Sequence, residues 1–279
     1  MNRLDQIVRS VGAALRDRKV RRPAALVVMG TGLDLFPERL DKTFEIELAE
    51  LGDVPAPWNR ARLVTGRHGD LDLWLLEDLS LDDTDGGPDW QRAFPCWLAA
   101  RAGARALVLA TAGAGLVDRF PPGSLAVVKD HVDLSASRTL VGLADSELGP
   151  LFPDQTRLHV ESLRHEAVAL ASEIGVDLHT AVAACVAGPR LETPAEARYY
   201  RSAGAEVSVQ GLGHLLAGSV HAGLGALVLV AVAGTSGQAA DLRRILEHAE
   251  KLAPTVEEIV LRLSSPLAEY AANFDAEEA

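Results

Sequence analysis

The sequence predicts a single α/β domain in which a mostly parallel mixed central sheet is flanked by helices. Two observations carry this prediction. Several apolar runs are continuous rather than alternating, which is typical of strands buried on both faces, and segments with helical periodicity fall between them. The 279 residues contain no internal repeat, no low-complexity linker and no break in composition, so we expect one domain over residues 1–279.

The first expected element is an amphipathic helix within residues 1–20, because apolar side chains such as Leu4, Ile7 and Val11 recur at helical spacing. Pro23 lies beyond its end, and the apolar run 24–29 then predicts a buried strand that leads into Gly30. Similar runs predict strands over 71–76, 106–110 and 125–128, and helical spacing predicts a helix over about 90–102.

The second half of the chain continues the alternation, with strands expected over 181–187 and 226–233. Helices are expected over about 158–175, 194–203, 212–222 and 241–263. The helix at 194–203 has the clearest start, because Thr193 offers an N-cap hydroxyl, Pro194 takes the first helical position and Glu196 the third. Residues 265–279 are expected to form a frayed tail.

The composition excludes several classes of function. The net charge is −12 and no basic stripe is present, which argues against a nucleic-acid partner, although a small anion needs only a local site. The longest apolar run, 222–234, is too short to span a bilayer, and the N-terminus does not resemble a signal peptide, so we expect a cytoplasmic protein without a membrane partner. Cys96 and Cys185 lie in apolar surroundings and predict buried free thiols rather than disulfides or a metal site.

Four segments follow expected strands, at the edge where α/β sheets bind ligands. They are residues 30–34, 111–116, 187–193 and 233–237, and all four are rich in glycine or small residues. Such loops expose backbone N–H groups to an anion or let a flat ligand approach closely, but simple tight turns have the same composition. Glu192 likewise has two interpretations: it satisfies the N–H groups of the following helix, or it faces a cleft and accepts hydrogen bonds from a ligand.

Taken together, these motifs resemble the trimeric purine nucleoside phosphorylases, the family that includes methylthioadenosine phosphorylase. The resemblance covers residues from about 24 to about 264. It rests on the following segments in this order: 30–33 (Gly-Thr-Gly-Leu), 86–90 (Gly-Gly-Pro-Asp-Trp), 111–116, 130–134 (Asp-His-Val-Asp-Leu) and 186–193, which contains Ala-Gly-Pro-Arg-Leu-Glu-Thr. It implies a nucleoside phosphorylase-like fold, a homotrimer, and a transferase that moves a pentosyl group from a purine to inorganic phosphate in purine salvage. Phosphate is then a co-substrate and no cofactor is expected.

Several site residues of the family are matched here. By resemblance, Thr31 supplies a hydroxyl to phosphate, Ala112 a backbone contact to phosphate, and Glu192 hydrogen bonds to the purine. His248 falls in step with the histidine that reaches the ribose 5′-hydroxyl, although an exposed helix histidine has the same pattern. Glu192 and His248 are therefore the expected catalytic residues, and Thr111 is expected to contact the nucleoside.

The phosphate side departs from the family pattern. Ser80 and Asp82 stand where the family has an arginine and a histidine, and Gly211 stands where a serine completes the phosphate site. Replacing a cation by a carboxylate weakens anion binding. Arg67 and Arg190 are possible replacement cations, and their alternative is to be solvated or paired with acidic neighbours.

The nucleoside side departs as well. Thr84 replaces the tyrosine at the ribose, Leu191 an aromatic residue, and Gln210 a methionine. Gly234 replaces the asparagine that binds the purine N7. The choice between 6-oxopurine, 6-aminopurine and methylthioadenosine therefore stays open.

Three functions are compatible with these residues. The first is a purine nucleoside phosphorylase whose phosphate and base sites are eroded. The second is a nucleoside-binding homologue that has lost phosphorolysis. The third is a nucleoside hydrolase that uses water, with Asp82 or Asp83 as the general base.

Overall fold

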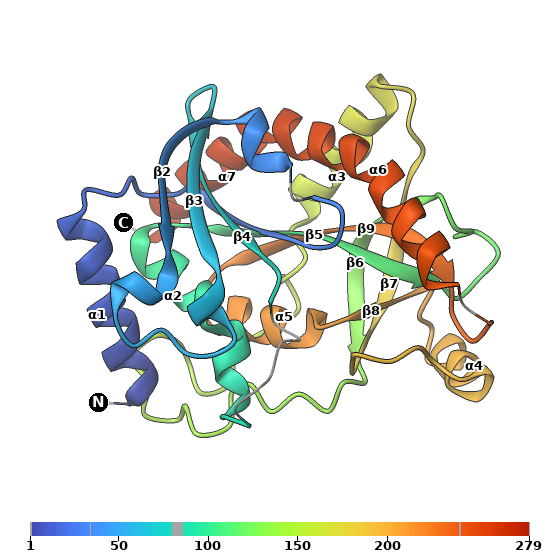
Figure 1. The fold of residues 1–279 in the computed structure, drawn as a ribbon, viewed down its shortest axis with the longest axis horizontal. Coiled ribbons are helices and arrows are strands. Elements are labelled where there is room, and N and C mark those ends of the chain that lie inside the picture. Colours follow the sequence, from blue (N-terminus) through green and yellow to red (C-terminus); the bar gives the residue numbers. More distant parts are fainter. Residues whose placement is uncertain (1, 34, 80–85, 240, 279) are drawn as a thin grey trace.

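The computed structural model describes residues 2–33, 35–79, 86–239 and 241–278, and in them a nine-stranded mixed sheet runs through the molecule (Figure 1). The strand order is β2-β3-β4-β1-β5-β8-β7-β6-β9. The strands are β1 (Ala25–Met29), β2 (Asp41–Glu47), β3 (Arg62–His68), β4 (Leu71–Glu77), β5 (Ala106–Gly115), β6 (Leu125–Asp133), β7 (Leu178–Val186), β8 (Val207–Gln210) and β9 (Gly225–Thr235).

Parallel pairing dominates the centre of the sheet. β1 runs parallel to β4 and β5, β5 to β9, and β7 to β6 and β8. The antiparallel pairs are β2–β3, β3–β4, β5–β8 and β6–β9. Because β5 pairs with both β8 and β9, strands β5, β8, β7, β6 and β9 close into a ring. The expected single α/β domain with a mostly parallel mixed sheet is confirmed.

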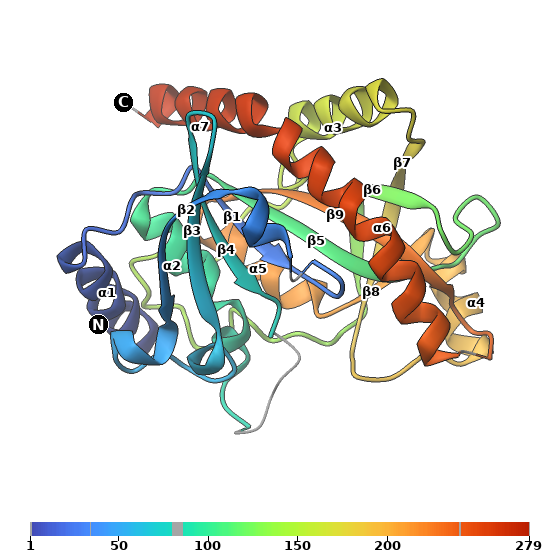
Figure 2. The same cartoon turned by 45° about the horizontal axis from the view of Figure 1, so that its top comes forward.

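Helices cover both faces of the sheet (Figure 2). The helices are α1 (Arg3–Asp17), α2 (Phe94–Ala102), α3 (Glu161–Glu173), α4 (Pro194–Ser202), α5 (Leu212–His221), α6 (Leu242–Arg262) and α7 (Ser264–Glu278). Alternate residues of one strand serve different cores. Leu26 and Val28 of β1 pack in a core with α1, α2 and α5, whereas Val27 packs in a second core with α3, α6 and α7. This double burial explains why the strands read as continuous apolar runs.

The structure adds elements that apolar runs did not reveal. β2, β3 and β8 were not expected, because β2 and β3 mix charged and apolar residues and β8 is only four residues long. The expected frayed tail over 265–279 is wrong for residues 265–278, which belong to α7. Leu263 and Leu267 are fully buried in the core that α6 and α7 share, so packing rather than local sequence holds this helix.

Both cysteines are free and buried, as expected. Burial raises the pKa of the Cys96 thiol and of the Cys185 thiol. Among the described helices, none combines the length and the apolar character needed to cross a membrane.

Candidate active site at the carboxyl ends of the strands

A cavity of about 770 Å³ lies where β1, β4, β5, β8 and β9 end or bend. The part of its wall that the strand ends supply consists of Met29, Gly30, Thr31, Gly32, Glu77, Asp78, Thr111, Ala112, Gly113, Ala114, Ser208, Gln210, Ala233 and Gly234. Three of the four strand-end segments that the sequence indicated therefore line this one cavity, through residues 30–32, 111–114 and 233–234. The fourth, 187–193, reaches it through Leu191 and Glu192.

The loop after β1 is shaped by close backbone contact. A Cβ atom on Gly30 would lie 2.9 Å from Thr111 Cα, and the Gly30 N–H donates to the Ala110 carbonyl at 2.7 Å. Gly32 has a φ of +89°, a conformation that favours glycine. These two glycines hold the exposed Thr31 at the cavity wall. The turn and the ligand site are thus the same loop.

The start of α4 decides between the two interpretations of Glu192. Thr193 Oγ1 accepts from the Glu196 N–H at 3.2 Å, and the Glu196 carboxylate accepts from the Thr193 N–H at 2.9 Å, which completes a capping box. Thr193 and Glu196 therefore satisfy this helix end between them. Glu192 lies on the cavity wall instead, half-buried, where its carboxylate can accept hydrogen bonds from a ligand.

The two proposed replacement cations do not reach the cavity wall. Both guanidinium Nη atoms of Arg190 contact the Glu196 carboxylate, at 2.8 and 3.0 Å, and this pairing lowers the pKa of Glu196 to about 2. Arg67 Nε lies 3.8 Å from Asp72 near the β3–β4 turn. That turn precedes β4, so Arg67 is at the opposite end of the strand from the cavity. In this structure both arginines pair with acidic neighbours, the alternative that the sequence left open, and neither lines the cavity.

Two other arginines do line the cavity, and apolar patterning missed them. Arg60 precedes β3 and Arg62 begins it, and Arg62 Nη1 pairs with Glu45 at 2.7 Å. Because β3 runs antiparallel to β4, the start of β3 lies beside the end of β4 and hence beside the cavity. Recognising 62–68 as a strand would have found them. Among the described residues of the wall, the carboxylates of Glu47, Glu77, Asp78 and Glu192 outnumber these two guanidinium groups.

Residues 33–265 match the family model described as the phosphorylase superfamily. This chain belongs to the phosphorylase superfamily. Purine nucleoside phosphorylase 1 of Bacillus subtilis (strain 168) is 25% identical over 260 residues, which cover 89% of this chain and 93% of that one. Purine nucleoside phosphorylase of Mycobacterium leprae is 34% identical over 184 residues, which cover 64% of this chain and 62% of that one.

Solved structures share the fold of this superfamily member. Isoform 2 of purine nucleoside phosphorylase from Schistosoma mansoni, in complex with cytosine and ribose-1-phosphate, superposes with a TM-score of 0.86 at 20% identity, over 94% of this chain and 96% of that one. The Schistosoma enzyme in complex with hypoxanthine gives a TM-score of 0.84. The family resemblance is confirmed.

Most of the positions carried over from the family lie on the cavity wall of this superfamily member, whether they keep or change the family residue. They are Thr31, Thr111, Ala112, Leu191, Glu192, Gln210 and Gly234. Gln210 Nε2 donates to the Arg190 carbonyl at 2.6 Å, so this amide also holds the loop that carries Leu191. Ser80, Asp82, Asp83 and Thr84 lie outside the described residues.

Two of the carried-over positions among the described residues are not on the wall. Gly211 is the N-cap of α5 and has a φ of +74°, so the residue after Gln210 serves a left-handed turn into the helix. His248 lies one helical turn beyond Ile245, which does line the cavity, and His248 Nδ1 is 3.1 Å from the Ala233 carbonyl. Within the described residues, no cluster of three or more potential metal ligands occurs.

Proposed function

We propose that this chain cleaves the N-glycosidic bond of a purine nucleoside with inorganic phosphate, releasing the free base and a pentose 1-phosphate. The observation that carries the proposal is the meeting of Thr31, Ala112 and Glu192 in one cavity at the carboxyl ends of the strands, in a member of the phosphorylase superfamily. The relatives named above are purine nucleoside phosphorylases.

The proposed division of labour follows from chemistry. The C–N bond breaks through a sugar with oxocarbenium character, so phosphate must be held on one side and the leaving base stabilised on the other. The Thr31 hydroxyl and the backbone at Ala112 are the proposed phosphate contacts, and the Glu192 carboxylate accepts from N–H groups of the purine. His248, held beside the wall by its contact with the Ala233 carbonyl, is the proposed partner of the ribose 5′-hydroxyl.

The charges of the wall predict weak phosphate binding. Arg60 and Arg62 are the described cations on the wall, and Glu77 and Asp78 place carboxylates at the end of β4 in the same cavity. Like charges oppose each other most strongly in a partly desolvated site. We therefore expect phosphate to saturate the enzyme only at high concentration.

The test is base release from inosine, guanosine and methylthioadenosine, with and without phosphate, followed by chromatography. We expect release that depends on phosphate and yields one pentose 1-phosphate for each base. Binding of nucleoside without release in either condition would show a binding protein and contradict the proposal.

Matched variants locate the site. Glu192→Ala removes a hydrogen-bonding carboxylate from the wall, and we expect kcat/KM to fall by roughly 10- to 100-fold without a loss of Tm. Its neighbour Thr193 caps α4, so Thr193→Ala should lower the free energy of unfolding by about 1 kcal/mol and leave more activity than Glu192→Ala. Equal loss of activity in both variants would contradict the assignment of Glu192.

A second candidate function, hydrolysis by water, is favoured by Asp78. Its side chain is half-buried at the end of β4 on the cavity wall, where a carboxylate can activate a water molecule. This candidate predicts base release without phosphate that Asp78→Asn abolishes.

For the assembly, we propose the homotrimer that the family resemblance implies, to be measured by light scattering.

A further inference from the structure

A buried serine of the cavity wall has a hydroxyl without a hydrogen-bond partner among the described residues. Ser208 is 2% exposed, and its Oγ atom pairs with none of the residues that the structure describes. In the part of the chain that the structure describes, the other buried side-chain atoms in this condition belong to Arg67, His159, His221 and Ser236, none of which lines the cavity. Buried polar groups are normally paired, so this hydroxyl, the one unpaired buried side-chain atom among the described wall residues, is a candidate to pair with a ligand.

The strand geometry sets the face on which Ser208 lies. Along β8, Val207 and Val209 pack in the core with α5, and the alternate residues Ser208 and Gln210 both line the cavity. Ser208 is paired with Ala114 of β5 on one side and with Ala184 of β7 on the other. Backbone pairing on both sides fixes the position of this residue.

Three other polar side chains of the cavity wall, those of Thr111, Glu192 and Gln210, already have partners or are acceptors only. The Gln210 amide nitrogen donates to the Arg190 carbonyl, and the Thr111 hydroxyl is 3.4 Å from the Ala112 carbonyl. An ionised Glu192 can only accept. A purine, however, presents ring nitrogens as acceptors and gains negative charge when it leaves the sugar. Such a leaving group needs a donor from the wall.

We infer that the Ser208 hydroxyl donates a hydrogen bond to an acceptor atom on the edge of the purine ring and so helps to hold the base and stabilise it as it departs. The inference rests on the proposed function, because it takes the ligand to be a purine nucleoside. It adds a base-recognition residue at a position that carries no charge and does not belong to a loop.

The first measurement is calorimetric binding of inosine to the unaltered protein, to Ser208→Ala and to Ser208→Cys. Loss of one neutral hydrogen bond should weaken inosine binding about five- to tenfold in both variants. The Tm of Ser208→Ala without ligand should not fall, because the variant removes an unpaired buried polar group. Ser219→Ala is the matched control: Ser219 is also fully buried, but its hydroxyl donates to the Leu216 carbonyl, away from the cavity, so inosine binding should not change.

The second measurement identifies the acceptor atom. Hypoxanthine offers N3, N7 and O6 as acceptors, and 3-deazainosine, 7-deazainosine and purine riboside each lack one of them. We expect one of these analogues to bind the unaltered protein and Ser208→Ala with the same Kd. If all three analogues lose as much affinity as inosine does, Ser208 acts through shape and the inference is wrong.

These measurements distinguish failure of the role of Ser208 from failure of the proposed phosphorolysis. Phosphorolysis of inosine with kcat/KM and Kd unchanged in Ser208→Ala overturns the role of Ser208 alone. Inosine binding that depends on Ser208, without base release, overturns the proposed function alone. Absence of both binding and release in the unaltered protein, with inosine, guanosine and methylthioadenosine alike, overturns both.

Discussion

Glu192 and Arg190 show how neighbours decide what a charged residue can do. The sequence left Glu192 divided between capping α4 and facing a cleft. Thr193 and Glu196 form the capping box of α4, so Glu192 does not cap this helix. Glu196 also forms an ion pair with the Arg190 guanidinium. Arg190 therefore stabilises this loop, whereas the Glu192 carboxylate is available to a ligand.

A pair of histidines predicts a pH dependence of stability. His131 Nδ1 and His159 Nε2 lie 3.0 Å apart. Burial, together with His131 and Arg164, lowers the pKa of His159 to about 4 against the opposing effect of Asp130, and burial also lowers the pKa of His131. The folded state therefore binds fewer protons than the unfolded state, in which histidine titrates near 6.5. Stability is full above pH 6.5 and falls as the pH drops from 6.5 towards 4.

We expect the free energy of unfolding to fall by up to about 1.4 kcal/mol per pH unit for His159 in this window. Urea titrations at pH 7, 6 and 5 measure this slope, and His159→Asn should make it shallower. The same slope in the variant would show that His159 is not the group that titrates.

At the scale of elements, β5 and β8 approach each other through glycine. A Cβ atom on Gly113 would lie 2.7 Å from the Ser208 carbonyl oxygen and 2.7 Å from Val230 Cγ1. The absence of a side chain at Gly113 thus lets β8 come close enough to place Ser208 and Gln210 on the cavity wall. The sequence indicated small residues at 111–116 but not the strand against which they pack.

Gly113→Ala should therefore lower the free energy of unfolding by about 1–3 kcal/mol and weaken nucleoside binding, because β8 must move. Urea denaturation and calorimetry measure the two effects. Gly12→Ala is the control. Gly12 lies inside α1, the nearest atom to its added Cβ is the Arg16 Nη1 at 3.5 Å, and alanine favours a helix, so stability should rise or stay the same. Unchanged binding in Gly113→Ala would contradict the role of this close contact.

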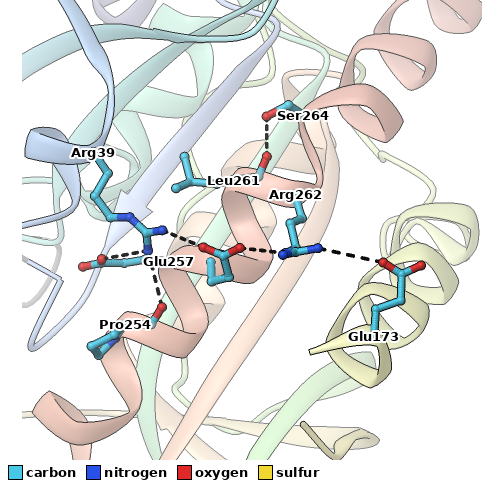
Figure 3. Close-up of polar contacts among 8 residues, drawn as sticks. Arg39, Glu173, Pro254, Glu257, Leu261, Arg262 and Ser264 are labelled. Carbon is cyan, nitrogen blue, oxygen red and sulfur yellow. Dashed lines mark hydrogen bonds and ion pairs between the residues drawn. The ribbon is translucent and has the colours of Figure 1, made fainter. Parts of the chain in front are cut away.

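At the scale of the whole molecule, an ion-pair network joins segments far apart in sequence (Figure 3). Arg39, at the end of the short helix Phe36–Arg39, contacts Glu258 of α6 at 2.6 Å and the buried Glu257 at 3.4 Å. Arg262 continues the network from Glu258 at 2.7 Å to Glu173 of α3 at 3.9 Å. The two arginines hold the pKa of Glu258 below its usual range. Pro37 and Ile245, from the segments that Arg39 joins, both line the cavity.

Arg39→Ala should lower the free energy of unfolding by about 1–3 kcal/mol, because it takes a partner from the buried Glu257. It should also raise KM for the nucleoside, since it loosens two walls of the cavity. Arg262→Ala is the matched control: its contacts are more exposed, so its effect on stability should be about 0–1 kcal/mol and KM should not change. An unchanged KM in Arg39→Ala would separate the network from the site.

The sequence by itself determined the α/β class, six of the strands and the strand-end segments that carry Thr31, Ala112 and Glu192, because apolar periodicity and loop composition are local properties of the chain.

Only the tertiary structure revealed α7, the charged strands β2 and β3, and the arginines on the cavity wall. Arg60 and Arg62 reach the cavity because β3 runs antiparallel to β4, and Arg67 misses it for the same reason. Ser208 is a further example. No sequence pattern distinguishes it, and only the position of β8 between β5 and β7 places it on the cavity wall, with a hydroxyl that pairs with no described residue. Pairing between distant segments decides which polar side chains converge, and no local pattern encodes it.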